Sequence, residues 1–333
     1  MATPDDSDDA MIRLENVCKT FPGGVDAVCD LSLEIARGET LVLLGTSGSG
    51  KTTTMKMINR LYEPTGGRIE VDGKDIMTQD VIRLRRKIGY AIQHIGLFPH
   101  MTMAENIGVV PKLLGWSQDR IDERVDDLLN RVGLEPESFR DRYPSQLSGG
   151  QRQRVGVARA LAADPPIVLM DEPFGALDPI TREQLQDEFL ELESEIQKTI
   201  VFVTHDVFEA VKMGDRVALM DEGRLQQLAR PAELVENPAN EFVDSFLGQH
   251  RFQLSLLTRT LKTMMGEKPA GEQPTEVPEV RLRAHNSLIE ALDAFKKTNR
   301  EKLPVYKRRQ YIGDLEKSSL VSTIAEVLGQ TGE

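Results

Sequence analysis

The stretch "GTSGSGKTT" (residues 45–53) combines residue types that bind phosphate. Glycines let the backbone curl so that successive amides face an anion, the Lys51 ammonium adds positive charge, and the Thr52 hydroxyl can ligate Mg²⁺. An apolar run precedes the stretch and a helical pattern follows it, which is the context that G-x-x-x-x-G-K-[ST] requires. The pattern therefore predicts a nucleotide-phosphate site rather than a glycine-rich turn without a ligand. The predicted contacts are Gly45, Thr46, Ser47, Gly48, Ser49, Gly50, Lys51, Thr52 and Thr53.

A second anion-binding pattern occurs about a hundred residues later, in "LSGGQRQR". Ser148, Gly149, Gly150 and Gln151 stand directly before a helical pattern whose first turn contains two arginines. Backbone amides at the start of a helix attract anions. The alternative is an ordinary capped helix start. Two phosphate-binding turns in one chain need an explanation.

Carboxylates follow an apolar run in "IVLMDEP". The run predicts a buried parallel strand, whose carboxyl end is where α/β sheets bind ligands. Asp171 there suits a Mg²⁺ shell, and Glu172 suits activation of a water molecule. The alternative is a solvated turn before Pro173. His205 ends another β-rich run, "TIVFVTH"; such a histidine is usually structural, but beside a triphosphate site it becomes a candidate contact of the γ-phosphate.

The elements that must position these residues form an α/β pattern over residues 11–248. β-rich runs alternate with longer helical patterns, as in α/β folds. Residues 12–35 alternate apolar and polar residues and predict antiparallel strands, whereas residues 116–142 have helical spacing and predict a helical insert. The predicted parallel strands are Thr40–Leu44, Ile167–Met170, Thr199–Thr204 and Arg216–Met220.

Composition excludes several classes of protein. The 333 residues carry 41 lysines and arginines against 53 aspartates and glutamates, so the net charge of −12 argues against nucleic-acid binding through bulk electrostatics. Cys18 and Cys29 form neither a CxxC pair nor a disulfide framework, which fits a reducing compartment. No apolar run reaches the roughly 18 residues of a spanning helix, so we expect any membrane role to be peripheral. The acidic residues 1–10 are expected to be a disordered tail.

In this order, the motifs resemble those of the ATP-binding subunit of an ABC transporter. The matching residues also include Gln93 in "AIQHIGLFPHMT", "ALD" at residues 176–178, and Phe21 at the aromatic position that stacks on adenine in this family. The resemblance covers residues 11–248. It implies a cassette with a mixed sheet core, an antiparallel β subdomain and a helical subdomain.

The resemblance also implies why there are two anion-binding turns. Family members work as head-to-tail dimers, in which residues 148–151 of one chain close over the ATP held by the phosphate loop of the other. Glu172 would act as general base, His205 would contact the γ-phosphate, Lys51 would neutralise phosphate charge, and Gln93 would approach Mg²⁺ and the attacking water. The metal would be held by Thr52, Gln93 and Asp171, and the segment containing Asp178 would follow the dimer seam.

The expected partners are a second copy of the ATPase, transmembrane permease subunits and an extracytoplasmic solute-binding protein, with no nucleic acid. The chain would lie at the cytoplasmic face of the inner membrane. Residues 93–107, with apolar Leu97, Phe98 and Met101, either pack internally or receive a helix of the membrane subunit. Their amino-acid sequence is similar to that of importers of glycine betaine, carnitine and choline. The alternatives are an importer of another small solute, such as an amino acid, a polyamine or a sugar, and a non-transport ABC ATPase of DNA repair or translation.

The C-terminal part has a different character. Residues 249–278 predict a helix, with Phe252, Leu256, Leu257, Leu261 and Met264 on one face, and then a Pro/Gly/Glu-rich linker. Residues 279–333 predict a β-α-β-β-α unit that resembles a single CBS (cystathionine-β-synthase) motif.

Members of the CBS family usually carry two copies, so a complete pair would need both chains of the dimer. Glu316 and Ser319 replace the ribose-contacting pattern, so adenosine-ligand binding is not expected. The unit would then be a dimer-stabilising appendage. The cluster Lys307-Arg308-Arg309 either faces anionic lipid or forms a solvated turn.

Overall fold

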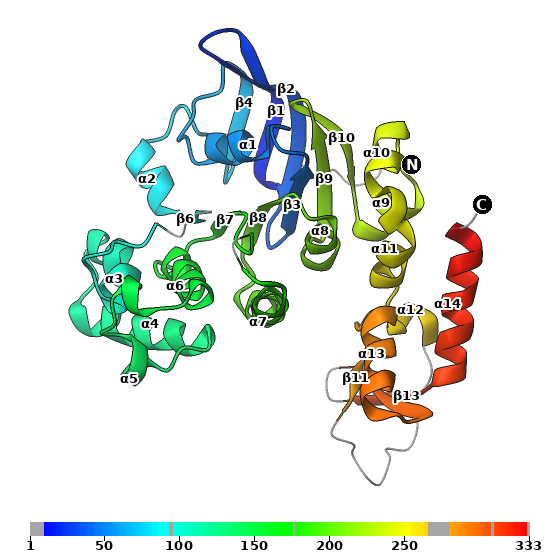
Figure 1. The fold of residues 1–333 in the computed structure, drawn as a ribbon. Coiled ribbons are helices and arrows are strands. Elements are labelled where there is room, and N and C mark those ends of the chain that lie inside the picture. The colour runs from blue at the N-terminus through cyan, green and yellow to red at the C-terminus, as the bar shows by residue number, and fades with distance from the viewer. Residues whose placement is uncertain (1–9, 93–95, 176, 266–279, 308–309, 332–333) are drawn as a thin grey trace. The chain divides into compact units, whose positions relative to one another are not determined.

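A computed structural model of the chain describes residues 10–92, 96–175, 177–265, 280–307 and 310–331 (Figure 1). These residues form two compact units, which divide between Ala229 and Arg230. Within the described ranges, no helix combines the length and the apolar character that a membrane crossing requires.

The first unit contains a four-stranded sheet in the order β2-β1-β4-β5. Strand β1 pairs antiparallel with both β2 and β4, which confirms the antiparallel strands predicted from the alternating pattern. Strand β1 begins at Ala10, inside the predicted acidic tail, whose other residues lie outside the described ranges. The strands are β1 (Ala10–Phe21), β2 (Val25–Ala36), β4 (Gly66–Val71) and β5 (Lys74–Asp75).

The second sheet of this unit has six strands in the order β10-β9-β3-β8-β7-β6. Strand β3 lies in the middle, parallel to β8 on one side and to β9 on the other, and only β10 runs antiparallel to its neighbour. The sheet is therefore mixed, and the four predicted parallel strands are confirmed. Its strands are β3 (Thr40–Gly45), β6 (Ile88–Ala91), β7 (Ile167–Asp171), β8 (Thr199–Thr204), β9 (Arg216–Asp221) and β10 (Arg224–Ala229).

Helices surround this sheet. The predicted helical insert is α4, whose buried residues Ile121, Val125, Leu128 and Leu129 recur at helical spacing. It packs near α3 and α6. The helices of the unit are α1 (Lys51–Ile58), α2 (Val81–Arg86), α3 (Met103–Leu113), α4 (Gln118–Arg131), α5 (Pro136–Phe139), the 3₁₀ turn Pro144–Gln146, α6 (Gly149–Leu161), α7 (Pro179–Ile196) and α8 (Val207–Met213).

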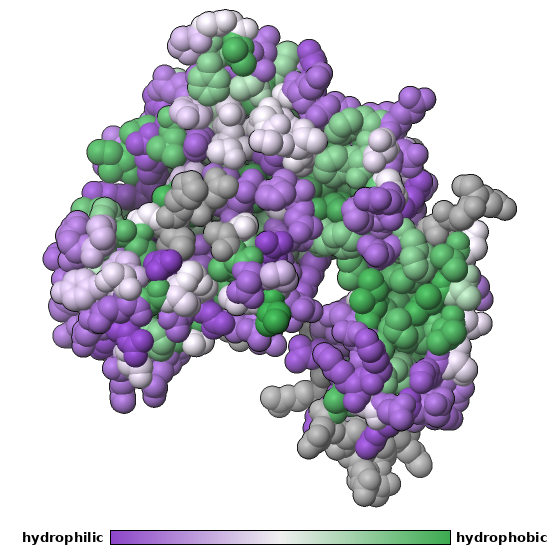
Figure 2. Space-filling model, in the orientation of Figure 1, coloured by the Kyte–Doolittle hydropathy of each residue, from purple (hydrophilic) through white to green (hydrophobic). Residues whose placement is uncertain are grey.

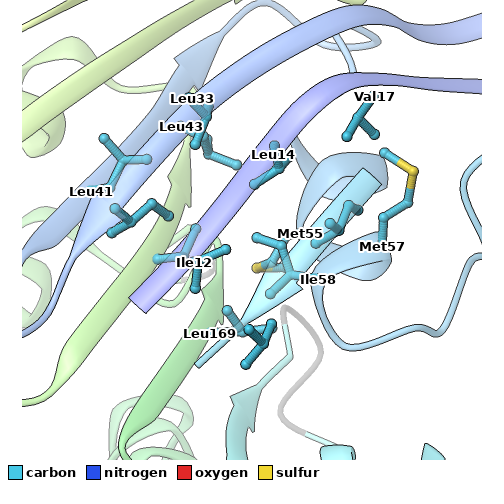
Figure 3. Packing of buried hydrophobic residues seen from close by; sticks show 14 of the residues in the cluster. Ile12, Leu14, Val17, Leu33, Leu41, Leu43, Met55, Met57, Ile58 and Leu169 are labelled. Atoms are coloured by element: carbon cyan, nitrogen blue, oxygen red, sulfur yellow. The ribbon is translucent and has the colours of Figure 1, made fainter. Parts of the chain in front are cut away.

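One buried apolar cluster connects both sheets to α1 (Figure 3). Ile12 and Leu14 of β1 lie beside Leu43 of β3 and Met55 of α1, all fully buried or nearly so. Burial of such a side chain stabilises the folded state by roughly 1.5–3 kcal/mol. The strand before the phosphate loop and the helix after it are therefore both anchored in the same core.

The second unit contains the predicted β-α-β-β-α order, as β11-α13-β12-β13-α14, around its own apolar cluster. Strand β12 pairs parallel with β11 and antiparallel with β13. The elements are α9 (Pro231–Glu236), α10 (Glu241–Leu247), the 3₁₀ turn Gly248–His250, α11 (Arg251–Thr258), α12 (Leu261–Met265), β11 (Leu282–Arg283), α13 (Leu288–Thr298), β12 (Lys302–Lys307), β13 (Gln310–Glu316) and α14 (Lys317–Thr331).

The single helix predicted after Gly248 is wrong, because the structure has two helices there. The chain is extended at Arg259, with φ −86° and ψ 122°, and the backbone amide of Leu261 donates to the carbonyl of Asn286 (2.9 Å). Backbone pairing with the segment around Asn286 thus replaces one helical turn. Hydrophobic residues gather on the face of this unit where Figure 1 draws α11, α12 and α14 (Figure 2), and Val321 and Leu328 of α14 are exposed.

Residues 230–248, which the sequence analysis assigned to the cassette, lie in the second compact unit. The domain limits 1–10, 11–248, 249–278 and 279–333 stay a prediction. The predicted linker lies largely outside the described residues, as do Arg308 and Arg309 of the basic cluster.

Candidate nucleotide site

The phosphate loop lies between β3 and α1, and its three glycines occupy left-handed or unusual backbone conformations. Their φ angles are +151° at Gly45, +84° at Gly48 and +97° at Gly50. A Cβ atom on Gly45 would stand 2.1 Å from the carbonyl oxygen of Met220, and one on Gly50 would stand 2.5 Å from that of Ala27. At these two positions a side chain cannot fit without moving the backbone, so the glycines shape the loop as predicted.

Lys51 is the first residue of α1 and its side chain folds back over the loop. The residue is 5% exposed, and its Nζ donates hydrogen bonds to the carbonyl oxygens of Gly45 (2.9 Å) and Thr46 (2.7 Å). Burial lowers the pKa of the Lys51 ammonium, while the nearby Glu172 and Asp171 carboxylates oppose that shift. The loop therefore holds a buried cation at its centre, suited to an anionic ligand.

A turn near the C-terminal end of the first unit, about 175 residues later in the sequence, supports this loop. Thr46 Oγ1 donates to Asp221 Oδ1 (3.3 Å), and the amide of Gly223 donates to the carbonyl of Ser49 (3.3 Å). The carbonyl of Gly223 in turn accepts from the amide of Cys29 in β2 (2.9 Å). This support is not predictable from the loop motif; its signal in the sequence is the Asp-Glu-Gly turn after β9.

Thr52 and Asp171, two of the predicted metal ligands, lie together. Thr52 Oγ1 donates to Asp171 Oδ1 (3.0 Å). Burial raises the pKa of Asp171, and the hydrogen bond from Thr52 opposes that shift. Among the described residues no group of three or more His, Cys, Asp and Glu side chains could hold a metal. A hydroxyl and one carboxylate still fit Mg²⁺, which in nucleotide sites takes few protein ligands and completes its shell with phosphate and water.

Glu172 and His205 also lie together, at the ends of adjacent strands. Glu172 adopts a left-handed conformation (φ +44°), and its amide donates to the carbonyl of Val203 in β8 (2.9 Å). His205 Nδ1 lies 3.3 Å from Glu172 Oε1, and the His205 side chain is 61% exposed. The imidazole is therefore held on one side by a carboxylate and is open to solvent on the other.

Phe21 is the last residue of β1 and is half-buried. Its ring meets that of Tyr62 edge to face, with centroids 5.3 Å apart, and Lys19 Nζ lies 5.3 Å from its centroid. Tyr62, which the sequence analysis did not select, therefore orients the aromatic ring predicted to stack on adenine.

Residues 148–151, which we call the signature turn, begin α6 as a capping box. Ser148 Oγ accepts from the amide of Gln151 (3.2 Å), and Gln151 Oε1 accepts from the amide of Ser148 (3.0 Å). Arg152 and Arg154 hold the neighbouring backbone, because they donate to the carbonyls of Leu147 (2.7 Å) and Val132 (2.9 Å) respectively.

Within the described residues, no hydrogen bond joins residues 148–151 to residues 45–53. The structure thus brings Lys51, Thr52, Asp171, Glu172 and His205 together but not the signature turn. A Cβ atom added at Gly149 would meet nothing within 4 Å among the described residues.

Gln93 and Ala176 lie outside the described residues, so their predicted roles stay predictions. Asp178 caps α7 by accepting from the amide of Thr181 (3.1 Å), and hydrogen bonding first to the side chain and then to the backbone of Thr181 lowers the pKa of Asp178. In the predicted permease-contacting segment, the Asn106 side chain donates to the carbonyls of Phe98 (3.2 Å) and Met101 (3.1 Å), and the Phe98 ring is 41% exposed. The loop is wound around a buried asparagine and leaves an aromatic ring at the surface.

Comparisons with known proteins agree with this geometry. The family model described as ABC transporter matches residues 28–175. The glycine betaine uptake ATP-binding protein YehX of Escherichia coli is 47% identical over 89% of this chain and 94% of its own length. The chain belongs to the ABC transporter family. The osmoprotectant import ATP-binding protein OsmV of Salmonella typhimurium is 49% identical, over 84% of this chain and 72% of that protein.

A third relative of this ABC transporter chain, the glycine betaine/carnitine/choline transport ATP-binding protein OpuCA of Bacillus subtilis, is 58% identical over 72% of the chain. This chain spans 63% of that relative's length. A solved dimeric ATP-binding cassette in a post-hydrolysis state, bound to ADP and Pi, matches 66% of the chain and 98% of its own length, with 36% identity and a TM-score of 0.60. The cassette fold predicted from the motifs is confirmed.

Proposed function

We propose that the chain is the ATP-hydrolysing subunit of an ABC importer for a quaternary-ammonium solute such as glycine betaine, choline or carnitine. The observation that carries the ATPase proposal is the convergence of Lys51, the Thr52–Asp171 pair and the Glu172–His205 pair at one edge of the six-stranded sheet. Ligands of α/β sheets bind at this carboxyl edge.

The residues divide the work of phosphoryl transfer to water. The loop amides and Lys51 bind the β- and γ-phosphates, and Thr52, Asp171 and Gln93 would hold Mg²⁺. When bound, Mg²⁺ neutralises charge on the phosphate oxygens. The oxygen of the attacking water forms the new bond to the γ-phosphorus, and Glu172 accepts a proton from that water. The bond from that phosphorus to the bridging oxygen breaks, and ADP leaves. His205 donates a hydrogen bond to the γ-phosphate.

The active centre is completed by a second copy of the chain. Ser148, Gly149, Gly150 and Gln151 begin a helix, where backbone amides attract an anion, yet in the described part of the chain they make no hydrogen bond to their own phosphate loop. We infer that this turn closes over the ATP of the partner. The solved dimer of a cassette with ADP and Pi supports this arrangement.

The cargo assignment rests on the relatives, whose printed names include glycine betaine, carnitine, choline and osmoprotectant transport. Uptake of labelled glycine betaine, choline and carnitine would be measured at high osmolarity, in cells that lack their own osmoprotectant systems and express this chain with its permease. We expect uptake of at least one of them, and none with Glu172→Gln. Uptake of none by an intact complex, with ATPase activity retained, would redirect the proposal to another small solute.

The partners follow from the importer assignment. Permease subunits would contact the surface around the exposed Phe98, an extracytoplasmic binding protein would deliver the solute, and the chain would lie on the inner face of the membrane. The C-terminal unit would pair with that of the second copy, which the exposed Val321 and Leu328 on α14 support. Analytical ultracentrifugation of the full chain and of a chain ending at residue 265 would test the pairing.

A further inference from the structure

Arg182 of α7 lies between two turns of the candidate site. Its NH2 donates to the carbonyl of Leu177 (3.3 Å), directly before the Asp178 cap of the helix. Its NH1 lies 3.6 Å from Asp206 Oδ2, directly after His205. One guanidinium therefore contacts both the turn that the proposed function places at the dimer seam and the turn that carries the imidazole.

Glu209 of α8 also lies near this guanidinium. The residue is 5% exposed, and its carboxylate accepts from Thr204 Oγ1 (2.7 Å) and from Gln186 Nε2 of α7 (3.2 Å). Arg182 Nε, which is buried and has no hydrogen-bond partner in the described structure, lies 3.9 Å from Glu209 Oε1. A buried carboxylate destabilises a protein unless it is paired, so this group depends on its contacts with Arg182, Thr204 and Gln186.

These contacts fix the backbone on both sides of His205. Thr204 Oγ1, which donates to Glu209, accepts from the amide of Asp206 (3.0 Å), and Asp206 Oδ1 accepts from the amide of Phe208 (2.8 Å). The His205 side chain is 61% exposed and contacts the Glu172 carboxylate. Its position beside Glu172 is thus set by the turn beneath it.

We propose that Arg182 and Glu209 are positioning residues for ATP hydrolysis, which hold the His205 turn against Glu172 and connect it to the segment before α7. Neither side chain touches the reactants; both act through His205. The inference rests on the proposed function and deepens it. Because that segment would lie at the dimer seam, the same contacts couple closure of the partner to the position of the imidazole.

The chain offers a matched control. Lys212 Nζ and Asp187 Oδ1 form an ion pair (2.7 Å) that joins the same two helices. Lys212 lies near the end of α8, away from the His205 turn. Lys212→Met therefore removes a basic side chain between α7 and α8 without touching the proposed network.

The test uses the full chain, with kcat and KM for ATP measured beside thermal unfolding. We expect Arg182→Met and Glu209→Gln each to lower kcat by about ten- to a hundredfold, because a displacement of about 1 Å of a catalytic group can cost about a hundredfold, with KM unchanged within about twofold. Arg182→Lys should recover part of the rate, and Lys212→Met should stay within twofold of the wild type. A fall in Tm with kcat unchanged per folded molecule, or an equal loss in Lys212→Met, would overturn the inference.

The two levels of the proposal can be told apart. If the wild type does not hydrolyse ATP, the proposed function fails and this inference fails with it. If the wild type hydrolyses ATP and His205→Ala does not, while Arg182→Met and Glu209→Gln keep the wild-type kcat, the ATPase assignment stands and only the positioning role is wrong.

Discussion

His205 Nδ1 lies 3.3 Å from Glu172 Oε1. The two residues meet because β7 and β8 are parallel neighbours, with Asp171 paired to Val203, so the residues that follow the two strands emerge at the same edge. The left-handed conformation of Glu172 turns the chain directly after the strand. The proposed base, Glu172, and the proposed γ-phosphate contact, His205, are therefore held side by side by the same pair of strands.

Glu172→Gln is expected to retain ATP binding and to lose turnover by about 10²- to 10⁴-fold, the usual contribution of a general base. Since ATP then stays intact between two chains, gel filtration with ATP and Mg²⁺ should show a two-chain species. Asp187→Asn, a change of an exposed acid on α7, serves as the control and should elute as the wild type does. A Glu172→Gln chain that stays monomeric with ATP would contradict the shared site.

Lys51→Met should weaken ATP binding by about tenfold or more, because a buried cation contributes roughly 1.5–3 kcal/mol per hydrogen bond to a charged ligand. Fluorescent-nucleotide titration measures the effect. The exposed Lys74 in β5 provides the control, since Lys74→Met changes the net charge equally but lies outside the loop. Equal losses in both variants would mean that net charge alone attracts the nucleotide.

Phe21→Ala should weaken nucleotide binding by about three- to tenfold with a smaller change in kcat, because an aromatic stack contributes roughly 0.5–1.5 kcal/mol. Phe21→Trp keeps a stacking face and should bind nearly as the wild type does. Titration with ATP and with inorganic triphosphate separates the causes. If triphosphate binding falls as much as ATP binding, the ring supports the loop and does not contact adenine.

Gly45→Ala and Gly48→Ala should differ in their effect on stability. A Cβ at Gly45 meets the carbonyl of Met220 at 2.1 Å, whereas one at Gly48 meets nothing within 4 Å. Both carry positive φ, so both cost about 1–3 kcal/mol in backbone strain, but Gly45→Ala adds an overpacking cost of about 1–3 kcal/mol. Urea unfolding of both variants measures this difference. Equal urea midpoints for the two variants would show that the Met220 carbonyl shifts to accommodate the added methyl group and that no overpacking cost arises.

The sequence predicts much of the candidate site because its residues sit at chain positions that local patterns mark. Lys51 and Thr52 follow a glycine loop, and Asp171 ends an apolar run, so each residue type and its strand or helix end can be read together. Parallel pairing then brings the strand ends to one edge. The resemblance to a family added the role of the signature turn at the partner's ATP and the adenine-stacking role of Phe21, which no spacing rule assigns.

Tertiary contacts explain what the sequence analysis missed. Leu256 and Leu261 have helical spacing in the sequence, and both are buried in the apolar cluster of the second unit. The backbone of Leu261 nevertheless bonds to Asn286, and the helix stops at Arg259. Arg182 and Glu209 look like ordinary helix-surface charges in the sequence. Only the packing of α7 against α8 makes one of them a buried carboxylate and the other its neighbour.

The turn at Gly223 has a consequence for biosynthesis. Strand β3 lies between β8 and β9, and Gly223 bonds to the loop residue Ser49, so every support of the phosphate loop on that side is encoded after it. A ribosome must translate past Gly223, and that residue must leave the exit tunnel, before β8, β9 and the Gly223 turn can support the loop. A nascent chain released earlier would carry the whole glycine-lysine motif without the contacts that support it.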